Sequence, residues 1–306
     1  MQHRPMSDGT EMTRPAAPSV SDADLKARLA DVKGFVIDMD GTLVLGDSRN
    51  QGLRALPGAA AFLAYLTDRD IPFVTLTNGT VRPPRAYVPK LRDAGLILAE
   101  NNVMTPSSVA ADYLCRRKFR RVMVLGGEGV SAPLAEAGLE IVRPPAFEGV
   151  DAVYVGWFRE FTMDDIEAAC EAIWAGAKLF TASFAPFFAT ANGRTLGTSR
   201  AIVGGITSIT GRRAKILGKP SQEALRCASR RLGLAPEEVA VIGDDPELEP
   251  AMARLGGAVG VGVTTGIAKH ADFAAVPPAR AAHLVVDNIG AFLRVYRMHR
   301  DSAAHS

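Results

Sequence analysis

The 306-residue chain is poor in the residues that build thiol and imidazole sites. It has three cysteines, widely separated in stretches with helical periodicity: Cys115, Cys170 and Cys227. This number and spacing predict neither a disulfide framework nor a zinc knuckle, and they are typical of a reducing compartment. We therefore expect a cytoplasmic protein. The five histidines suggest no Ser-His-Asp or Cys-His catalytic set, since several of them lie near the chain ends.

Strong net charge and long apolar runs are also missing. The formal net charge is +2 at pH 7, so we expect neither nucleic acid nor an anionic membrane as a partner. The basic cluster within residues 116–121 is interpreted as a solvated helix end. No apolar stretch approaches the roughly 20 residues of a membrane span. Residues 1–21 are rich in Pro, Ser and Thr without a signal-peptide pattern, so they are predicted to be a disordered tail.

What the chain does contain is a regular alternation of short apolar runs with amphipathic stretches. Runs rich in Val and Ile are followed by segments with helical spacing, such as 58–69, 106–117 and 220–232. This alternation predicts an α/β fold with a parallel sheet covered by helices. The predicted strands are 34–38, 71–77, 101–105, 121–125, 151–156, 177–182, 214–217, 238–243 and 257–263.

Two carboxylates stand at the end of the first predicted strand. Asp38 and Asp40 are two residues apart, so they start out on the same face of the strand. Buried like charges repel each other unless a cation or a proton lies between them. The pair therefore suits a divalent metal, with one carboxylate free to attack an electrophile. A pair of solvated turn aspartates is the ordinary alternative.

Three other strand ends carry polar residues that decide between these interpretations. The segment Thr77-Asn78-Gly79 ends one strand, Lys219 follows another, and Asp244 follows a third. Each one alone also fits a common turn or a helix start. Because ligands of doubly wound sheets bind beyond the carboxyl ends of the strands, the four sets together predict one site. Their chemistry is that of phosphoryl transfer.

The predicted roles follow from what a phosphate monoester requires. Asp38 would be the nucleophile that forms an aspartyl-phosphate, and Asp40 would be the general acid and base. The segment Thr77-Asn78-Gly79 would bind phosphoryl oxygens through the Thr77 hydroxyl and through the Asn78 backbone and amide. Lys219 would add positive charge against the phosphate and the nucleophile.

The metal prediction rests on oxygen ligands alone. Asp38 and Asp244 would coordinate the ion, with water completing an octahedron. Neither histidine nor cysteine is part of the predicted set, so Mg²⁺ is the expected ion.

The four motifs resemble those of a known family. They read Asp38-Met39-Asp40-Gly41-Thr42, Leu76-Thr77-Asn78, Gly218-Lys219-Pro220-Ser221 and Ile242-Gly243-Asp244-Asp245. They are similar to motifs one to four of the haloacid dehalogenase superfamily, and the finer match is to subfamily IIA. That subfamily includes nucleotide phosphatases, 4-nitrophenyl phosphatase-like proteins and pyridoxal phosphate phosphatase. The resemblance implies an Mg²⁺-dependent phosphatase of small phosphorylated metabolites, with the Asp40 backbone carbonyl as a further metal ligand.

The resemblance also implies a domain architecture. A Rossmann-like, doubly wound core would comprise residues 22–118 and 209–298. An inserted α/β cap domain would span 119–208 and cover the site, and 299–306 would form a C-terminal tail. Cap-mediated dimers are common in similar proteins, so a homodimer through the cap is expected.

Two departures from the family pattern stand out. Similar proteins usually carry an Asp five residues after the first acid of motif four, where this chain has Glu249. Either Glu249 or Asp245 is therefore expected to support the metal. In the cap, relatives typically read Ala-Thr-Asn-x-Asp where this chain reads Thr-Ala-Ser-Phe-Ala over 181–185. Ser183 and Phe184 are the candidate specificity residues. Phe184 with Phe187 and Phe188 either packs inside the cap or forms an apolar lid over the leaving group.

Three functions remain open at this level. The main prediction is a phosphoric monoester hydrolase. A phosphotransferase or phosphomutase on the same scaffold would differ only in the acceptor. A non-catalytic sensor of a phosphorylated ligand is the alternative from another class, although the intact acids and Lys219 argue against it.

Overall fold

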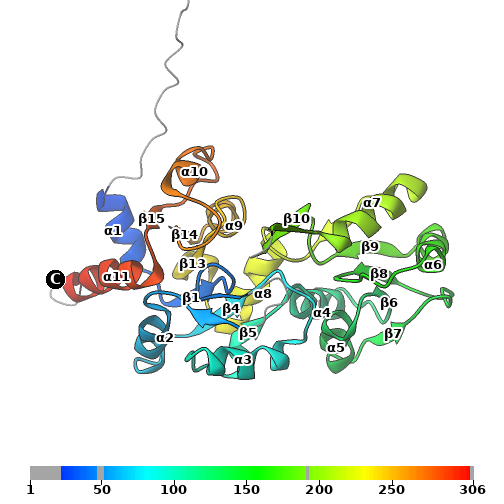
Figure 1. Cartoon of the computed structure of the whole chain (residues 1–306), viewed down its shortest axis with the longest axis horizontal. Helices are drawn as coiled ribbons and strands as arrows, with labels where there is room; N and C mark the ends of the chain where they lie inside the picture. The colour runs from blue at the N-terminus through cyan, green and yellow to red at the C-terminus, as the bar shows by residue number, and fades with distance from the viewer. Residues whose placement is uncertain (1–21, 47–51, 191–192, 304–306) are drawn as a thin grey trace, which may run out of the picture.

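The computed structural model describes residues 22–46, 52–190 and 193–303 and shows two lobes side by side (Figure 1). Each lobe is built around one parallel sheet. We call the lobe around the six-stranded sheet the core lobe and the lobe around the five-stranded sheet the cap lobe. The tail predicted over residues 1–21 lies outside the described residues.

The core lobe holds a six-stranded parallel sheet with the order β15-β14-β13-β1-β4-β5. Its strands are β1 (Gly34–Ile37), β4 (Phe73–Leu76), β5 (Val103–Met104), β13 (Val239–Gly243), β14 (Val259–Val263) and β15 (Leu284–Val286). The chain adds strands outward from β1 in one direction and then outward from β13 in the other. The strand order therefore reverses between β1 and β13, which is the switch point where doubly wound sheets bind ligands.

Helices cover both faces of this sheet because successive side chains of its buried strands point to opposite faces. On β1, Phe35 and Ile37 pack in the hydrophobic cluster beneath α1, α2, α3 and α11, whereas Val36 packs in the cluster beneath α4, α8 and α9. Phe35 makes edge-on ring contacts with Phe62 at 5.2 Å and Tyr296 at 5.1 Å between centroids. Both faces of the sheet are therefore closed to water beneath the switch point.

The helices divide between the two lobes. Those of the core lobe are α1 (Asp22–Ala30), α2 (Ala59–Thr67), α3 (Val88–Asp93), α4 (Pro106–Arg116), α8 (Gln222–Leu232), α9 (Glu249–Gly256), α10 (His270–Ala274) and α11 (Ile289–Ala303). Those of the cap lobe are α5 (Glu128–Glu136), α6 (Met163–Trp174) and α7 (Thr198–Thr210). Three short 3₁₀ turns, η1 (Pro84–Ala86), η2 (Glu100–Asn102) and η3 (Pro236–Glu238), complete the helical elements of the described chain.

The cap lobe holds a second parallel sheet with the order β12-β9-β8-β6-β7. Its strands are β6 (Arg121–Leu125), β7 (Glu140–Val142), β8 (Ala152–Val155), β9 (Lys178–Thr181) and β12 (Lys215–Ile216). Two hairpins lie outside the large sheets: β2 (Val44–Leu45) with β3 (Arg54–Ala55), and β10 (Phe187–Thr190) with β11 (Gly193–Leu196). In Figure 1, β10 stands where the two lobes meet.

The two lobes share part of their interior. One cluster of buried side chains includes Val74 of β4 and Leu114 of α4 in the core lobe, and it continues into Val124, Tyr154 and Phe180 of the cap strands. The opposite face of the cap sheet packs separately against α6 and α7. The cap sheet is therefore fastened to the core lobe by apolar packing as well as by chain connections.

The structure confirms the predicted α/β class and each predicted strand, with small shifts at the ends. Three placements differ from prediction. The strand predicted over 214–217 was assigned to the core, but β12 pairs with β9 in the cap sheet. The C-terminal tail predicted from residue 299 is helical as far as Ala303 in α11. The predicted boundary at residue 209 falls within α7, so it does not separate the two sheets.

No helix among the described residues combines the length and the apolar character needed to cross a membrane.

His283 is a buried histidine that links β14 to the segment before β15. Its Nδ1 accepts a hydrogen bond from the Gly260 N–H at 2.9 Å, and its own backbone N–H donates to the Gly260 carbonyl at 2.8 Å. Burial, together with the charges of Arg254 and Arg28, lowers the pKa of His283 to about 4. The folded state therefore holds this side chain neutral.

This pKa predicts a specific pH dependence of stability. The unfolded chain takes up a proton near pH 6.5, before the folded chain does, so stability falls as the pH drops from 6.5 towards 4. Between pH 7 and pH 5 the wild type should lose about 2 kcal/mol more unfolding free energy than His283→Asn, which keeps an acceptor for Gly260 but does not titrate. Urea unfolding at the two pH values measures this difference. The exposed His270→Asn serves as the control and should behave as the wild type; equal losses in all three proteins would contradict the assignment.

Candidate active site

Asp38 directly follows β1 at the switch point of the core sheet, and its carboxylate is buried. One oxygen, Oδ1, forms an ion pair with the Lys219 amine. The other, Oδ2, accepts a hydrogen bond from the Thr42 hydroxyl at 3.1 Å. Both oxygens are thus oriented by the protein, as a nucleophile that must meet phosphorus along one line requires.

Asp40 lies in a different environment, although it is only two residues away. Its Oδ2 accepts a hydrogen bond from the Thr77 hydroxyl at 3.0 Å. Burial and the Asp38 charge raise the pKa of Asp40 to about 6, against the opposing effects of Thr77 and Lys219. One carboxylate is therefore matched by a cation and the other by a neutral hydroxyl.

The Thr77-Asn78-Gly79 segment is more involved in holding the site than the sequence predicted. The Thr77 hydroxyl donates to Asp40 and accepts the Gly79 N–H at 2.9 Å, so it orients the acid. The Asn78 side chain accepts the Lys219 N–H at 2.9 Å and donates to the Lys219 carbonyl at 3.1 Å. The Asn78 amide, predicted to hold phosphoryl oxygens, here binds the Lys219 backbone through both its oxygen and its nitrogen.

Lys219 is placed by the start of α8. Ser221 is the N-cap of that helix and its hydroxyl accepts the Ala224 N–H at 3.2 Å, and Gly233 ends the helix in a left-handed conformation. The Lys219 side chain is only 3% exposed. Burial alone would lower its pKa, but the Asp38 and Glu249 carboxylates hold the pKa well above the ordinary value. Lys219 is therefore a fixed positive charge at the carboxyl end of β1.

Glu249, expected as a possible metal ligand, contacts Lys219. It is the first residue of α9, and its Oε1 lies 2.6 Å from the Lys219 amine. Burial raises the pKa of Glu249 to about 7, with Lys219 opposing and Asp38 adding to the rise. Asp245, the other candidate, accepts the Glu247 N–H through Oδ1 at 2.9 Å, which shapes the loop before α9. Glutamate is one methylene longer than the aspartate usual at this position, and its carboxylate forms an ion pair with Lys219.

Asp244 directly follows β13 on the other side of the switch point. Its Oδ2 accepts the Ile267 N–H at 2.9 Å. The carboxylate lies so close to two glycines that an added Cβ would approach Oδ2 to 2.4 Å at Gly41 and to 1.8 Å at Gly266. Gly41 also has φ of +86°, which other residues rarely adopt. Both glycines are therefore required where they stand.

The charges around Asp244 are suited to a cation. Burial and the charges of the Asp38 and Glu249 carboxylates raise its pKa to about 8. Among the described residues, no group of three or more His, Cys, Asp or Glu side chains is arranged to hold a metal ion. A metal at this edge would therefore depend on the two carboxylates Asp38 and Asp244 with a backbone carbonyl and water, which is a donor set that Mg²⁺ accepts.

The two candidate specificity residues of the cap, Ser183 and Phe184, differ in their exposure to solvent. Ser183 is buried, and its hydroxyl accepts the Ala185 N–H at 3.2 Å, so it stabilises its own loop. Phe184 is 39% exposed and does not pack inside the cap. The Arg200 guanidinium lies over its ring, 4.9 Å from the centroid. The side chains of Phe187 and Phe188 lie outside what the structure describes.

Two contributors to the site were not predicted: the Thr42 hydroxyl and the loop 264–267. Thr42 stands within the first motif, so its hydroxyl could have been found there. The loop 264–267 gives no local signal, because it reaches Gly41 and Asp244 only through the fold. The predicted residues Asp38, Asp40, Thr77, Asn78, Lys219 and Asp244 do meet at one edge of the core sheet through the contacts given above.

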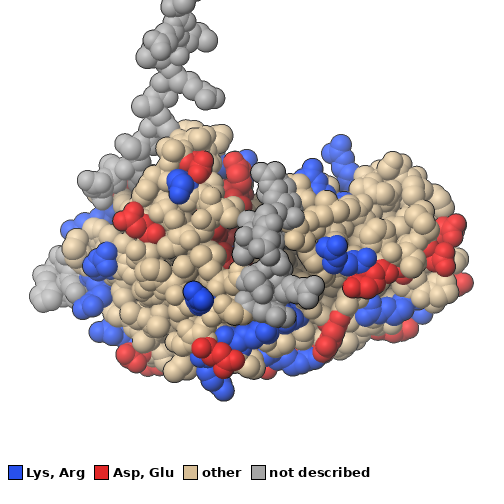
Figure 2. All heavy atoms as spheres, in the orientation of Figure 1, with Lys and Arg blue, Asp and Glu red and all other residues tan. Residues whose placement is uncertain are grey.

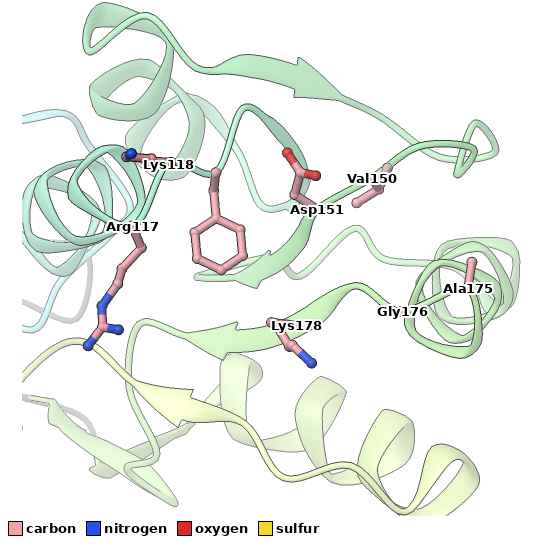
Figure 3. A pocket seen from close by; sticks show the side chains of 8 residues that line it. Arg117, Lys118, Val150, Asp151, Ala175, Gly176 and Lys178 are labelled. Atoms are coloured by element: carbon pink, nitrogen blue, oxygen red, sulfur yellow. The ribbon is translucent and has the colours of Figure 1, made fainter.

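A shallow, open hollow of the protein lies elsewhere. It has a volume of about 420 Å³ and is lined by Arg117, Lys118, Asp151 and Lys178, among others, at the amino ends of the cap strands (Figure 3). The site residues border the opposite, carboxyl ends. Arg117 and Lys118 follow the end of α4, where cations offset the negative end of the helix dipole. Asp151 accepts the backbone N–H groups of Arg120 and Arg121. Structural roles thus account for Arg117, Lys118 and Asp151.

Comparison with known proteins agrees with the geometry. A family model described as haloacid dehalogenase-like hydrolase matches residues 35–140, and a second model of the same kind matches 216–292. The acid sugar phosphatase of Staphylococcus haemolyticus is 29% identical over 217 residues, which is 71% of this chain and 79% of that protein.

Solved structures extend the match to the whole fold. The p-nitrophenyl phosphatase from Archaeoglobus fulgidus superposes with a TM-score of 0.76 at 26% identity, covering 87% of this chain and 99% of that one. A glycerol phosphate phosphatase from Mycobacterium tuberculosis, solved in complex with magnesium, has a TM-score of 0.75 at 24% identity, over 86% of this chain and 76% of that one. The protein therefore belongs to subfamily IIA of the haloacid dehalogenase superfamily and is a phosphatase.

Proposed function

We propose that this phosphatase hydrolyses small phosphate monoesters through an aspartyl-phosphate on Asp38 and depends on Mg²⁺. The observation that carries the proposal is the division of labour between two neighbouring carboxylates. Asp38 is ion-paired with the buried Lys219, whereas Asp40 is hydrogen-bonded to the neutral Thr77 hydroxyl. Such a difference in environment is how a pair of carboxyl groups takes up separate nucleophile and acid roles.

In the first step an Asp38 oxygen attacks phosphorus. The bond from phosphorus to the leaving oxygen breaks, and that oxygen takes a proton from the Asp40 carboxyl group. In the second step a water molecule attacks the phosphorus of the aspartyl-phosphate. Asp40 accepts the proton of that water, and the Asp38 carboxylate leaves, so inorganic phosphate is released and both side chains return to their starting state.

Lys219 and Thr42 position the nucleophile throughout this cycle. Lys219 holds Oδ1 of Asp38 and also places a positive charge beside the phosphoryl group. Thr42 orients Oδ2. The Asn78 amide fixes the Lys219 backbone on both its N–H and its carbonyl, so the cation stays aligned while the charge on phosphorus changes.

The residues for Mg²⁺ are Asp38, Asp244 and the Asp40 backbone carbonyl. The close approach of Asp244 to Gly41 and Gly266 and its raised pKa support a bound cation at this edge. When bound, Mg²⁺ would neutralise phosphoryl oxygens and lower the barrier to attack by an anion. The magnesium in the related glycerol phosphate phosphatase adds support by analogy.

Small phosphorylated metabolites are the proposed substrates, in keeping with the names of the relatives. The acid sugar phosphatase and the glycerol phosphate phosphatase act on small phosphate esters by their names. Hydrolysis is favoured over phosphotransfer because these relatives are phosphatases. The intact set of Asp38, Asp40, Lys219 and Asp244 opposes a non-catalytic sensor.

Replacing Asp40 and replacing Asp38 should give different kinetic defects. In Asp40→Asn, 4-nitrophenyl phosphate should release about one equivalent of nitrophenolate per site in a fast burst, because nitrophenolate leaves without a proton. Steady turnover should then be 10²–10⁴-fold slower than in the wild type, because the second step lacks its base. Asp38→Asn should show neither burst nor turnover. Stopped-flow absorbance and mass spectrometry of the acid-quenched protein, with a phosphoryl group on the peptide containing Asp38, measure both.

The exposed Asp31→Asn, on the segment that leads into β1, is the matched control and should keep wild-type kinetics. Turnover in Asp38→Asn near the wild-type rate would exclude the proposed nucleophile. A phosphoryl group on another residue would do the same.

Replacing Glu249 should change kcat without changing the affinity for Mg²⁺. Because its carboxylate contacts Lys219, Glu249→Gln should lower kcat about ten-fold or more by loosening the lysine. The Mg²⁺ concentration for half-maximal activity should stay within about two-fold of the wild type. A titration of activity against Mg²⁺ measures both quantities, with Asp245→Asn assayed beside it. A large rise in the required Mg²⁺ at unchanged kcat would instead make Glu249 a metal-supporting residue.

A further inference from the structure

Arg200 is an exposed cation of the cap lobe with unusual partners. It is the third residue of α7. Its guanidinium lies 4.9 Å from the centroid of the Phe184 ring, and one of its N–H groups donates to the Phe184 carbonyl at 3.2 Å. Within the described part of the chain it forms no ion pair with a carboxylate. The ring and the carbonyl therefore hold the guanidinium in place while its charge remains unmatched.

The helix does not explain a cation at this position. The amino end of an α-helix is its positive end, so an arginine in the first turn is electrostatically unfavourable there. The first turn of α7 carries no acidic residue, and its N-cap, Gly197, supplies no side-chain hydrogen bond. Local choices that oppose local stability are expected where a residue serves a ligand.

One connection places Arg200 close to the catalytic edge. The Ala182 carbonyl accepts the Gly218 N–H at 3.0 Å, directly before Lys219. Phe184 is two residues beyond Ala182, so it lies at most about 7 Å further along the chain. The start of α7 packs against the same loop, because a Cβ on Gly197 would come within 2.0 Å of the Ala185 carbonyl oxygen.

A second, independent connection runs through the loop after β8. The Trp157 N–H donates to the Thr80 hydroxyl at 2.9 Å, and Thr80 follows Thr77-Asn78-Gly79 in the core lobe. The next residue, Phe158, donates its N–H to the Thr198 hydroxyl in the first turn of α7 at 3.2 Å. The amino end of α7 is therefore fastened to both catalytic loops, two residues from Arg200.

The charges around the catalytic edge indicate what kind of group Arg200 binds. The catalytic edge carries the carboxylates Asp38, Asp40 and Asp244, with Lys219 already shared between Asp38 and Glu249. In Figure 2 acidic side chains stand on the core lobe beside its boundary with the cap lobe, and the cap lobe carries both basic and acidic side chains. A second negative group on a substrate would be repelled by the carboxylates of the core edge and attracted to the guanidinium of Arg200.

We propose that Arg200, held against the Phe184 ring, binds a second anionic group of the substrate, a carboxylate or a second phosphate, while the scissile phosphate lies at Asp38. This inference rests on the proposed function and narrows its substrate class to phosphate monoesters with a further negative group. It replaces the apolar lid predicted around Phe184 by a charged one, in which the ring supports the guanidinium.

Matched substrate pairs test the proposal. The wild type should prefer 3-phosphoglycerate to glycerol 3-phosphate, which differ by a carboxylate against a CH₂OH group, or fructose 1,6-bisphosphate to fructose 6-phosphate. We expect a preference in kcat/KM of at least ten-fold for one anionic member, falling as salt is added. Arg200→Gln should remove most of that preference through KM, and Arg200→Lys should keep part of it. Comparison of the two pairs distinguishes a carboxylate from a second phosphate.

Arg117→Gln is the matched control, because Arg117 also lies over a ring, that of Tyr113 at 5.5 Å, but at the far edge of the cap. Phe184→Asn should weaken the preference by removing the support for the guanidinium. Equal losses for both members of each pair in Arg200→Gln, or an undiminished preference, would overturn the inference. A wild type that hydrolyses the substrates with a single phosphate as their only anionic group, without preferring those with a second anionic group, overturns this inference alone. A wild type without any Mg²⁺-dependent hydrolysis overturns the proposed function.

Discussion

The contact on which the site depends is the buried ammonium group of Lys219 between Asp38 and Glu249. It joins the end of β1, the segment before α8 and the start of α9, which are far apart in the sequence. Breaking such a buried pair from one side leaves an unmatched charge in the interior, which is strongly destabilising. Asn78 adds a fourth segment by binding the Lys219 backbone. One side chain thus sets the relative positions of the catalytic loops.

Much of this arrangement could be predicted because a parallel sheet translates sequence order into spatial order. A polar residue directly after an apolar strand must lie at the carboxyl edge, so Asp38 and Asp244 could be assigned to one site before any distance was known. The repeated strand-helix spacing likewise gave the α/β class, and each predicted strand is present. The division into core and cap came from the family resemblance, and it misplaced β12 because a two-residue strand carries no signal of which sheet it joins.

The partners of individual side chains could not be predicted in the same way. Asn78 and Thr77 have the chemistry to bind phosphate, but they also have the chemistry to bind the protein, and the fold uses them for Lys219 and Asp40. Glu249 was expected near the metal by its place in the motif, yet its longer side chain reaches the lysine. Arg200 gave no signal, since its neighbour Phe184 is 16 residues away along the chain. The partner of each side chain depends on differences in reach of one or two covalent bonds. The spacing of residues in the sequence does not resolve such differences.

The hydrophobic cluster that runs from α4 into the cap strands has a consequence for how the enzyme can evolve. Val124, Tyr154 and Phe180 of the cap lobe pack in the same cluster as Leu114 and Val74 of the core lobe. The two lobes therefore share one hydrophobic interior. Replacing the cap lobe by that of a relative would therefore require new side chains throughout this shared interior. New specificities are therefore more accessible through exposed residues such as Phe184 and Arg200, which can change while the interior beneath them stays as it is.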